Sequence, residues 1–346
     1  MSGRKGVSSD GISRAPELTI VFLSWNTREM LLDAVRSAWP PDGVDAELIV
    51  VDNASSDGSA EAVTQSFPDA RVIRNRENLG FAGGANVGLY AARAPLIVLL
   101  NSDTLVLGSA MKALVAYAAA HPEAAIIGPR ILNSDGSLQA SYSRFPSLIG
   151  LVSQATYLYK LFPSSRWLNG VRLGGLSLDS PREVDVVSGC CFMLRRDLLE
   201  SIGGLDEGYF MYSEETDFSF RAKSAGYSVH YAPVGEIVHH GGGSTRLASR
   251  RMFLEFRRSL VRFFWKNYSP LSASVARCVL VLFLTVRLPY WGVRSLVHSK
   301  HQEESRRRLG NYLAGIGFLA RPVRHILATR ERPRAGEPGV AHGEDN

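Results

Sequence analysis

Two carboxylates that close short apolar runs are the first candidates for chemistry in this chain. Asp52 ends the run ELIVVD, and Asp103 follows the run LIVLL, with Asn101 and Ser102 between them. A carboxylate in such a position can accept hydrogen bonds from a nucleobase or ribose, or hold a hard cation such as Mg²⁺ or Mn²⁺ together with phosphate oxygens. The alternatives are a polar turn with an Asx cap at Asp52 and a helix cap at Asp103.

A cluster of three carboxylates lies further along the chain. Glu214, Glu215 and Asp217 fall within four residues. Such carboxylates repel one another, and crowding can raise one pKa and so produce a general base. The alternative is an acidic helix start that the helix macrodipole favours, with Asp217 paired to Arg221 one turn later. Aromatic residues on both sides of the cluster argue against a fully solvated face.

A glycine-rich segment, NLGFAGGAN at residues 78–86, precedes a predicted helix. Glycines allow a backbone to approach a ligand closely, and a helix N-terminus attracts phosphate. The segment is neither a dinucleotide-binding G-x-G-x-x-G motif nor a P-loop with its lysine. A tight entry into the helix is therefore the alternative interpretation.

Two adjacent histidines, His239 and His240, precede three glycines. Neighbouring side chains of a strand point to opposite faces, so at most one of the two can meet a given metal ion. A lone histidine is more often structural than a ligand, and the sequence leaves both interpretations open.

The elements that must position these residues follow from the hydrophobic pattern. Apolar runs rich in β-formers alternate with segments of helical spacing, which predicts βαβ units and a mostly parallel sheet with helices on both faces. The predicted strands are 18–24, 47–52, 71–74, 96–100, 124–127 and 184–194, and a further strand ends in the glycine loop at 237–243. The predicted helices are 27–38, 59–67 and 109–120, and 80–92 is predicted to be a loop that runs into a helix. Functional residues of such sheets sit at the carboxyl ends of the strands. The aromatic segment 143–162 is a candidate lid or acceptor wall.

The C-terminal part differs in charge from the rest of the chain. Residues 246–334 contain 19 Lys and Arg against four Asp and Glu, a net charge of +15, whereas the remainder carries −9. This asymmetry predicts an anionic surface as the partner of the C-terminal part. No recognised nucleic-acid-binding motif occurs, so we expect no nucleic-acid partner.

The same C-terminal part contains apolar residues at helical spacing. The apolar stretch 271–297 is interrupted by Arg277, Arg287 and Arg294, and its longest uncharged run, 278–286, has nine residues. A membrane-spanning helix needs about 20. We therefore expect basic amphipathic helices that lie in a membrane interface. Core or dimer helices, and a tilted or re-entrant insertion, remain alternatives.

Length and composition limit the classes of protein to which this chain can belong. A chain of 346 residues, 45% hydrophobic and 21% charged, predicts about two domains and excludes collagen, coiled coil and wholesale disorder. Three cysteines, two of them adjacent, cannot build a disulfide framework, which indicates a reducing compartment. The polar residues 1–16 lack the apolar core of a signal peptide and are expected to be a disordered leader.

Taken together and in this order, eight segments resemble the family 2 glycosyltransferases of the GT-A fold. They are Ser24–Asn26, Val51–Gly58, Asn78–Gly84, Asn101–Asp103, Ser188–Phe192, Gly203–Glu207, Glu214–Asp217 and His239. Each is weak alone, but eight in sequence are specific, and the resemblance covers residues 17–246. Within the family, the pattern is most similar to rhamnosyltransferase-like enzymes that build bacterial surface polysaccharides.

The resemblance implies a role for each matching residue. Asp52 corresponds to an aspartate that contacts the nucleobase, and Asp103 to the last aspartate of a D-x-D motif that holds metal and diphosphate. The first position of that motif is Asn101 here, and His239 falls where some members supply a second metal ligand. Glu215 takes the place of the usual catalytic base. The residues implied to bind the nucleotide donor are Ser24, Asn26, Asp52, Asn78, Gly80, Gly83, Asn101, Ser102 and Asp103.

Glu215 stands where the family's motif has an aspartate, which lengthens the carboxylate's reach by one methylene. Glu214 and Asp217 therefore remain alternative bases. The metal implied is Mg²⁺ or Mn²⁺, held by Asp103 and His239.

The activity implied is an inverting, metal-dependent transfer of a sugar, with rhamnose as the candidate, from a dTDP- or UDP-sugar. The acceptor is a hydroxyl of a glycan or of a polyprenyl-diphosphate-linked sugar, and the enzyme is cytoplasmic and peripheral on the inner face of the plasma membrane. Galactofuranose, glucose or N-acetylglucosamine as the sugar, and a non-catalytic nucleotide-binding scaffold, are the alternatives. We expect a glycosyltransferase domain at 17–246, a basic membrane-associating helical region at 247–330 and a disordered tail at 331–346.

Overall fold

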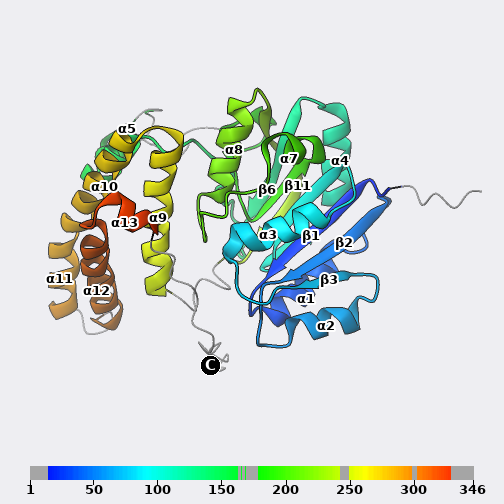
Figure 1. Ribbon diagram of the computed structural model, residues 1–346, viewed down its shortest axis with the longest axis horizontal. Coiled ribbons are helices and arrows are strands. Elements are labelled where there is room, and N and C mark those ends of the chain that lie inside the picture. Colours follow the sequence, from blue (N-terminus) through cyan, green and yellow to red (C-terminus); the bar gives the residue numbers. More distant parts are fainter. Residues whose placement is uncertain are drawn as a thin grey trace, which may run out of the picture.

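The computed structural model describes residues 15–162, 165, 168, 178–241, 249–297 and 302–328. The predicted leader, apart from its last two residues, and the predicted tail lie outside these ranges. The described residues form an α/β body and a group of helices from the C-terminal part, with the helix of residues 249–267 between them (Figure 1).

The body is built on a nine-stranded sheet in which six strands run in the same direction. Its strand order is β3-β2-β1-β4-β10-β6-β11-β5, and β8 pairs with β11. Strands β10, β5 and β8 are antiparallel to their neighbours. The strands are β1 Leu18–Ser24, β2 Ala46–Asp52, β3 Arg71–Arg74, β4 Leu96–Asn101, β5 Thr104–Leu107, β6 Ala124–Leu132, β8 Arg182–Glu183, β10 Cys191–Arg195 and β11 Ser228–His239; β7 Tyr142–Ser143 and β9 Val186–Val187 form a second, two-stranded sheet.

Helices cover both faces of the main sheet (Figure 1). The side chains of Leu18, Ile20 and Phe22 in β1 belong to a core cluster with α1, α2 and α4, whereas Val21 and Leu23 belong to a cluster with α3, α7 and α8. This division follows from the two-residue period of a strand and explains why the whole of β1 is buried. The helices are α1 Arg28–Ala38, α2 Ser59–Ser66, α3 Gly80–Ala91, α4 Ala110–Ala120, α7 Arg196–Ile202 and α8 Glu214–Ser224.

The predicted fold class, a mostly parallel α/β sheet with helices on both faces, is confirmed. Several strands differ from the prediction: β7, β8 and most of β11 were not predicted, and β6 is longer than the predicted 124–127. The four residues of β5 were not predicted as a strand, because a run this short is hard to distinguish from a loop. The predicted strand 184–194 is two strands, β9 and β10, which belong to different sheets.

The C-terminal helices have a hydrophobic core of their own. This cluster joins Leu151 of α5, Phe264 of α9, Ala276 of α10, Phe318 of α12 and Ile326 of α13. The aromatic segment 143–162 thus contributes α5 to the helical group. The helices are α5 Leu148–Thr156, α6 Leu158–Leu161, α9 Ser249–Asn267, α10 Pro270–Thr285, α11 Leu288–Val297, α12 Gln302–Leu319 and α13 Val323–Ala328.

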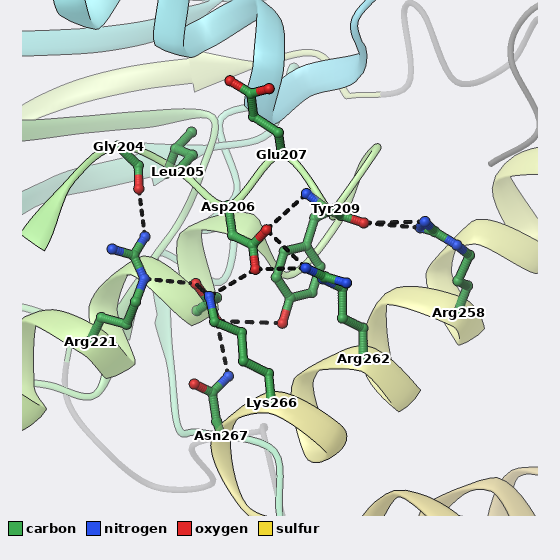
Figure 2. Close-up of polar contacts among 12 residues, drawn as sticks. Gly204, Leu205, Asp206, Glu207, Tyr209, Arg221, Arg258, Arg262, Lys266 and Asn267 are labelled. Atoms are coloured by element: carbon green, nitrogen blue, oxygen red, sulfur yellow. Dashed lines mark hydrogen bonds and ion pairs between the residues drawn. The ribbon is translucent and has the colours of Figure 1, made fainter. Parts of the chain in front are cut away.

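A basic stripe on α9 binds this helix to the α/β body (Figure 2). Arg258, Arg262 and Lys266 follow one another at four-residue spacing. Arg258 donates to the carbonyl oxygen of Gly208 at 3.2 Å, Arg262 donates to Asp206 at 3.0 Å, and Lys266 donates to Asp206 at 2.8 Å. These three cations are therefore engaged inside the protein and not free for an anionic surface.

Two further arginines of the C-terminal part also point inward. Arg287 donates to the carbonyl oxygen of Gln154 in α5 at 2.8 Å, and Arg277 donates to that of Arg321 at 2.9 Å. Pro270–Leu296 is the one stretch within the described residues that is long and apolar enough to cross a membrane, by length and composition, and 33% of its most apolar window is buried. Because Arg277 and Arg287 are bonded to backbone carbonyls, the arginines that interrupt this stretch in the sequence make its surface look more polar than it is.

Candidate active site

The carboxyl ends of the central strands, the start of α8 and the helical group enclose a cavity of about 520 Å³. Eight of the predicted site residues lie on its wall: Asn78, Gly80, Asn101, Ser102, Asp103, Glu214, Glu215 and His239. Five others do not line it: Ser24, Asn26, Asp52, Gly83 and Asp217. The structure therefore brings the two predicted metal ligands and two of the three candidate bases to one cavity.

Asp103 and His239 meet because β5 returns antiparallel to β11. The turn after β4 carries Asp103, and His239 pairs with Thr104 in the register of the two strands. His239 Nε2 lies 3.4 Å from Asp103 Oδ1, and His239 Nδ1 lies 2.8 Å from Oε1 of Gln139, which the sequence analysis did not single out. Burial lowers the pKa of His239, but the contacts with Asp103 and Cys190 outweigh it and raise this pKa to about 10.

Asn101 completes a set of donors that suits a divalent cation. Its Oδ1 is buried and has no hydrogen-bond partner. An amide oxygen, the Asp103 carboxylate and the His239 imidazole are ligands that Mn²⁺ and, for the oxygens, Mg²⁺ accept. Such a cation would displace the proton that His239 otherwise shares with Asp103, since a metal binds neutral imidazole.

A second group of His and Glu residues lies far from this set. His121, Glu123 and His230 have ligand atoms within 4.8 Å of one another. His230 is near the start of β11, at the opposite end of the strand from His239, and its ring nitrogens contact the hydroxyl groups of Tyr117 and Ser228. This group is therefore separate from the predicted metal site.

Asp52 ends β2 beside the cavity and is almost fully buried. Its Oδ2 accepts a hydrogen bond from the backbone N–H of Ser55 at 3.2 Å, whereas its Oδ1 is buried without a partner. Burial raises the pKa of this carboxyl. A buried acceptor that lacks a donor is costly, so a ligand N–H or O–H at Oδ1 would be stabilising.

Ser24 and Asn26 shape the loops around this site. The hydroxyl of Thr27 links Ser24, at 3.0 Å, to Ser102, at 2.7 Å. Asn26 Oδ1 accepts a hydrogen bond from the backbone N–H of Ser56 at 2.7 Å. Both predicted residues therefore hold neighbouring loops together.

The glycine-rich segment serves close packing of the backbone. Gly80 has φ +78°, and a Cβ there would lie 2.4 Å from the carbonyl oxygen of Phe210. Asn53 joins the segment by donating to Asn78 Oδ1 and to the carbonyl oxygen of Gly80, both at 3.0 Å. At Gly83, a Cβ would lie 2.9 Å from that of Leu79. The tight helix entry that the sequence analysis kept as an alternative is thus present, beside the cavity.

Glu214 and Glu215 begin α8 after an unusual turn. Tyr212 and Ser213 both have left-handed backbone conformations, with φ 70° and 65°. Glu214 is buried, and its Oε2 has no partner, while Glu215 Oε1 accepts from the hydroxyl of Thr216 at 3.1 Å. Burial raises the pKa of both carboxyls, and the charge of Glu215 raises that of Glu214 further. A raised pKa suits a carboxylate that must accept a proton near neutral pH.

Asp217 is placed differently from the two glutamates. It is fully buried and accepts from Arg221 at 2.9 Å, as the pairing interpretation predicted, from Lys266 at 2.8 Å and from Asn267 at 3.0 Å. Its contacts join α8 to α9 behind the cavity wall.

Sequence reasoning missed the far wall of the cavity. That wall comes from helices of the C-terminal part and consists of Arg251, Met252, Phe256, Arg257 and Leu260 on α9 and Val279, Leu280 and Phe283 on α10. The four-residue spacing of Met252, Phe256 and Leu260 is a signal for one helix face, but not for what it covers. The predicted acceptor wall, 143–162, does reach the cavity through Ser143, Arg144, Pro146, Leu151 and Gln154.

The sheet order, the helices on both faces and the cavity at the strand ends define a GT-A fold, the class of nucleotide-diphospho-sugar transferases. The chain belongs to the family described as "Glycosyl transferase family 2", whose model matches residues 19–203, more than half of its length. It is a glycosyltransferase, as the eight segments predicted.

Relatives of known name support this assignment. The N-acetylglucosaminyl-diphospho-decaprenol L-rhamnosyltransferase of Mycobacterium tuberculosis is 32% identical over 209 residues, which are 57% of this chain and 67% of the relative. The low-salt glycan biosynthesis hexosyltransferase Agl10 of Haloferax volcanii is 26% identical over 295 residues, 83% of this chain and 87% of the relative. The resemblance to the rhamnosyltransferase-like branch is thus confirmed.

A solved structure has the same fold over most of its length. The mannosyltransferase PcManGT of Pyrobaculum calidifontis, in complex with GDP-Man and Mn²⁺, superposes with a TM-score of 0.50 at 16% identity and covers 88% of both chains. Because the identity is low, this likeness concerns the fold.

Proposed function

We propose that this glycosyltransferase moves a sugar, with rhamnose as the first candidate, from a dTDP- or UDP-sugar to a hydroxyl of a glycan or polyprenyl-diphosphate-linked acceptor, with inversion. The observation that carries the proposal is the convergence of Asp103, His239 and Glu215 on one cavity. The relative from M. tuberculosis supports rhamnose and a lipid-linked acceptor through its name.

The donor occupies the strand-end half of the cavity. Asp52 lies beside this half, next to the lining residue Asn53, and in this proposal its orphaned Oδ1 accepts a hydrogen bond from the base or ribose. Asp103, His239 and Asn101 hold Mg²⁺ or Mn²⁺, which when bound offsets the negative charge of the diphosphate leaving group. The Mn²⁺ in the complex of PcManGT with GDP-Man is consistent with a divalent cation in this fold.

Glu215 is the base in this proposal. Its carboxylate takes the proton of the acceptor hydroxyl while the hydroxyl oxygen forms a bond to the anomeric carbon from the face opposite the nucleotide. The bond from that carbon to the diphosphate oxygen breaks, and its electron pair leaves with the nucleoside diphosphate. Glu214, on the same wall, remains the alternative base, whereas the ion pairs of Asp217 with Arg221 and Lys266 make it a residue that positions α8.

We assign residues 17–246 to the glycosyltransferase domain and 247–330 to a helical region that lies on the inner face of the plasma membrane. Support comes from an exposed apolar stripe along α10 and α11, formed by Leu271, Val275, Leu282, Val286, Tyr290, Val293 and Leu296. These side chains follow helical spacing on the surface of the most apolar stretch. An apolar helix face of this kind inserts into the boundary between headgroups and acyl chains.

Replacing each glutamate in turn tests the catalytic assignment. Glu215→Gln should lower kcat by about 10²–10⁴-fold, because general-base catalysis contributes about that much. Nucleotide diphosphate binding should be unchanged. Glu214→Gln, in the adjacent position, is the matched control and should retain more activity. Equal losses in the two variants, or full turnover by Glu215→Gln, would contradict the role given to Glu215.

Thermal unfolding with nucleotides tests the donor site separately. A ligand at about 100 times its Kd adds roughly 2.7 kcal/mol to the free energy of unfolding. We expect one of UDP and dTDP to stabilise the protein more than GDP and CDP do, and to do so more strongly with Mg²⁺ or Mn²⁺. The absence of any shift would count against the roles of Asp52 and Asp103.

A further inference from the structure

The half of the cavity away from the strand ends has a different character. Its wall is apolar, with Phe256 and Leu260 on α9 and Leu280 and Phe283 on α10. Two arginines of α9, Arg251 and Arg257, lie on the same wall. A nucleotide and a sugar are polar, so an apolar lining of this extent indicates that another ligand occupies this half.

Arg257 is the unusual residue of this wall. Its guanidinium lies over the Phe253 ring, 3.3 Å from the centroid, and donates to the carbonyl oxygen of Phe253, while its Nε is buried without a partner. Burial lowers the pKa of Arg257 to about 10, and no carboxylate of the described residues offsets this. Three further basic residues of α9, Arg258, Arg262 and Lys266, have carboxylate partners.

A partly buried guanidinium whose Nε has no partner and which lacks a counter-charge is costly unless an anion joins it. Arginine binds phosphate strongly, because its planar donors match two phosphate oxygens. We propose that this half of the cavity binds the lipid end of the acceptor, with Arg257 holding a phosphate of an isoprenoid diphosphate and the apolar side chains of α9 and α10 packing on the first isoprenoid units. This inference rests on the proposed function and names its acceptor site.

The route by which the lipid chain would reach the membrane is inferred from α5 and α10, because each helix has residues that line the cavity and residues that are exposed. On α10, Leu280 and Phe283 face the cavity while Leu282, and Val286 just after the helix, are exposed. On α5, Leu151 faces the cavity while Ile149 is exposed. These two helices pack together, and each has residues that line the cavity and residues that are exposed on the outer surface. An isoprenoid chain held inside can thus continue to the membrane.

The position of the phosphate also accounts for the place of the base. Arg257, Glu215 and Asp103 line the same cavity. A sugar joined to a diphosphate at Arg257 extends toward the strand ends, where its hydroxyl meets Glu215 and the donor. From the helical wall to the strand ends, the acceptor in this proposal therefore runs from the lipid through the diphosphate and the sugar to the reacting hydroxyl.

Binding of farnesyl diphosphate to the full chain tests this site. We compare the wild type with Arg257→Gln, and with Arg250→Gln as the matched control, because Arg250 is an exposed arginine on the same helix. Losing one charge-assisted phosphate contact should weaken farnesyl diphosphate binding by roughly 10- to 100-fold in Arg257→Gln and leave it unchanged in Arg250→Gln. Arg257→Lys should restore part of the affinity.

Two further probes separate the phosphate from the chain. Inorganic pyrophosphate and farnesol should each bind at least about tenfold more weakly than farnesyl diphosphate. Val279→Asn, on the apolar wall, should weaken binding of farnesyl diphosphate but not of pyrophosphate. Equal affinity for pyrophosphate and farnesyl diphosphate would overturn the proposal in favour of a free-phosphate site.

Nucleotide binding by the same variants keeps the two proposals distinguishable. Arg257→Gln should retain the nucleotide-induced thermal shift of the wild type, which also shows that it folds. If that shift is intact and farnesyl diphosphate binds Arg257→Gln as well as the wild type, the acceptor site is wrong and the donor site stands. If the wild type shows no nucleotide shift, the proposed function itself fails.

Discussion

At the scale of single residues, the proposed metal site departs from the pattern that the resemblance implies. Asn101 stands in place of a carboxylate, and its oxygen is buried without a partner. His239 compensates in part, because it lies 3.4 Å from Asp103 on the neighbouring strand. A set with one carboxylate, one amide and one imidazole carries less negative charge than a two-carboxylate set. Its affinity for a hard cation should be correspondingly lower.

Asn101→Asp should therefore increase the affinity for Mn²⁺. We expect the Mn²⁺ concentration that gives half of the nucleotide-induced thermal shift to fall by about tenfold, since ligand charge tunes such sites. Without a cation, the added buried carboxylate should lower the melting temperature. Asn311→Asp, on α12, adds the same charge away from the cavity. An unchanged Mn²⁺ dependence of Asn101→Asp would argue that position 101 does not reach the cation.

Gly80 is a second residue whose role is local. It combines a positive φ with a close approach to Phe210. Gly136 has nearly the same φ, +79°, but nothing within 4 Å of an added Cβ. Gly136→Ala thus measures the backbone strain alone, about 1 kcal/mol. Gly80→Ala should destabilise the protein by about 2 kcal/mol more in urea unfolding, because backbone must also move. An equal loss of stability in Gly80→Ala and Gly136→Ala would show that the backbone around Phe210 moves aside without a measurable cost.

At the scale of elements, α9 connects α8, which carries the candidate bases, to the C-terminal helices. Asp206 accepts from Arg262 and Lys266, and the latter also donates to Asp217 of α8 (Figure 2). The segment between Asp206 and α8 carries the strained turn that places Glu214 and Glu215. Movement of α9 would therefore change the position of the candidate base.

The pH dependence of stability tests this connection. Burial opposes ionisation of Asp206, but Lys266, the Gly208 N–H and Arg262 outweigh it and lower the pKa to about 2. Because this folded-state value lies below the unfolded value of about 3.9, the contribution is complete above pH 4 and is lost as the pH falls toward 2. Asp206→Asn should therefore cost about 2 kcal/mol at pH 7 and progressively less between pH 4 and 2.

Asp33→Asn is the control for that measurement. Asp33 forms an ion pair with Arg36 at 2.8 Å, but both side chains are largely exposed, so its loss should cost at most about 0.5 kcal/mol. A difference between Asp206→Asn and the wild type that persists unchanged to pH 2 would contradict the low pKa of Asp206.

The elements also show how far the sequence predicts this structure. Strands β1, β2 and β4 were predictable because each is a largely buried apolar run, and the polar ends of β2 and β4 located Asp52 and Asp103. The far wall of the cavity was not predictable. Helical spacing indicates that Phe256 and Arg257 belong to one helix, but it does not indicate which part of the protein that helix packs against. Asp217 was ambiguous for a similar reason, since its partner Lys266 lies 49 residues away.

At the scale of the whole molecule, basic residues of the C-terminal part make two kinds of contact inside the protein. Arg258, Arg262 and Lys266 bind the α/β body, and Arg277 and Arg287 bind backbone carbonyls within the helical group. The net charge of this part therefore overstates what it can offer to anionic lipids. The exposed stripe on α10 and α11, including Leu271 at 74% and Leu296 at 80% exposure, should contribute more than these charges to the proposed membrane binding.

This division predicts how vesicle binding responds to salt. Electrostatic attraction weakens with ionic strength, whereas insertion of apolar side chains does not. Co-sedimentation with anionic vesicles should therefore decrease only in part between 0.1 and about 0.5 M NaCl. Replacing Leu282 and Val286 together with Glu should abolish binding at both salt concentrations, because two carboxylates then face the acyl chains. Leu138→Glu, at an exposed apolar residue outside the helical group, should bind like the wild type. Binding that disappears with salt and survives the double substitution would place the membrane contact on the remaining arginines instead of on α10.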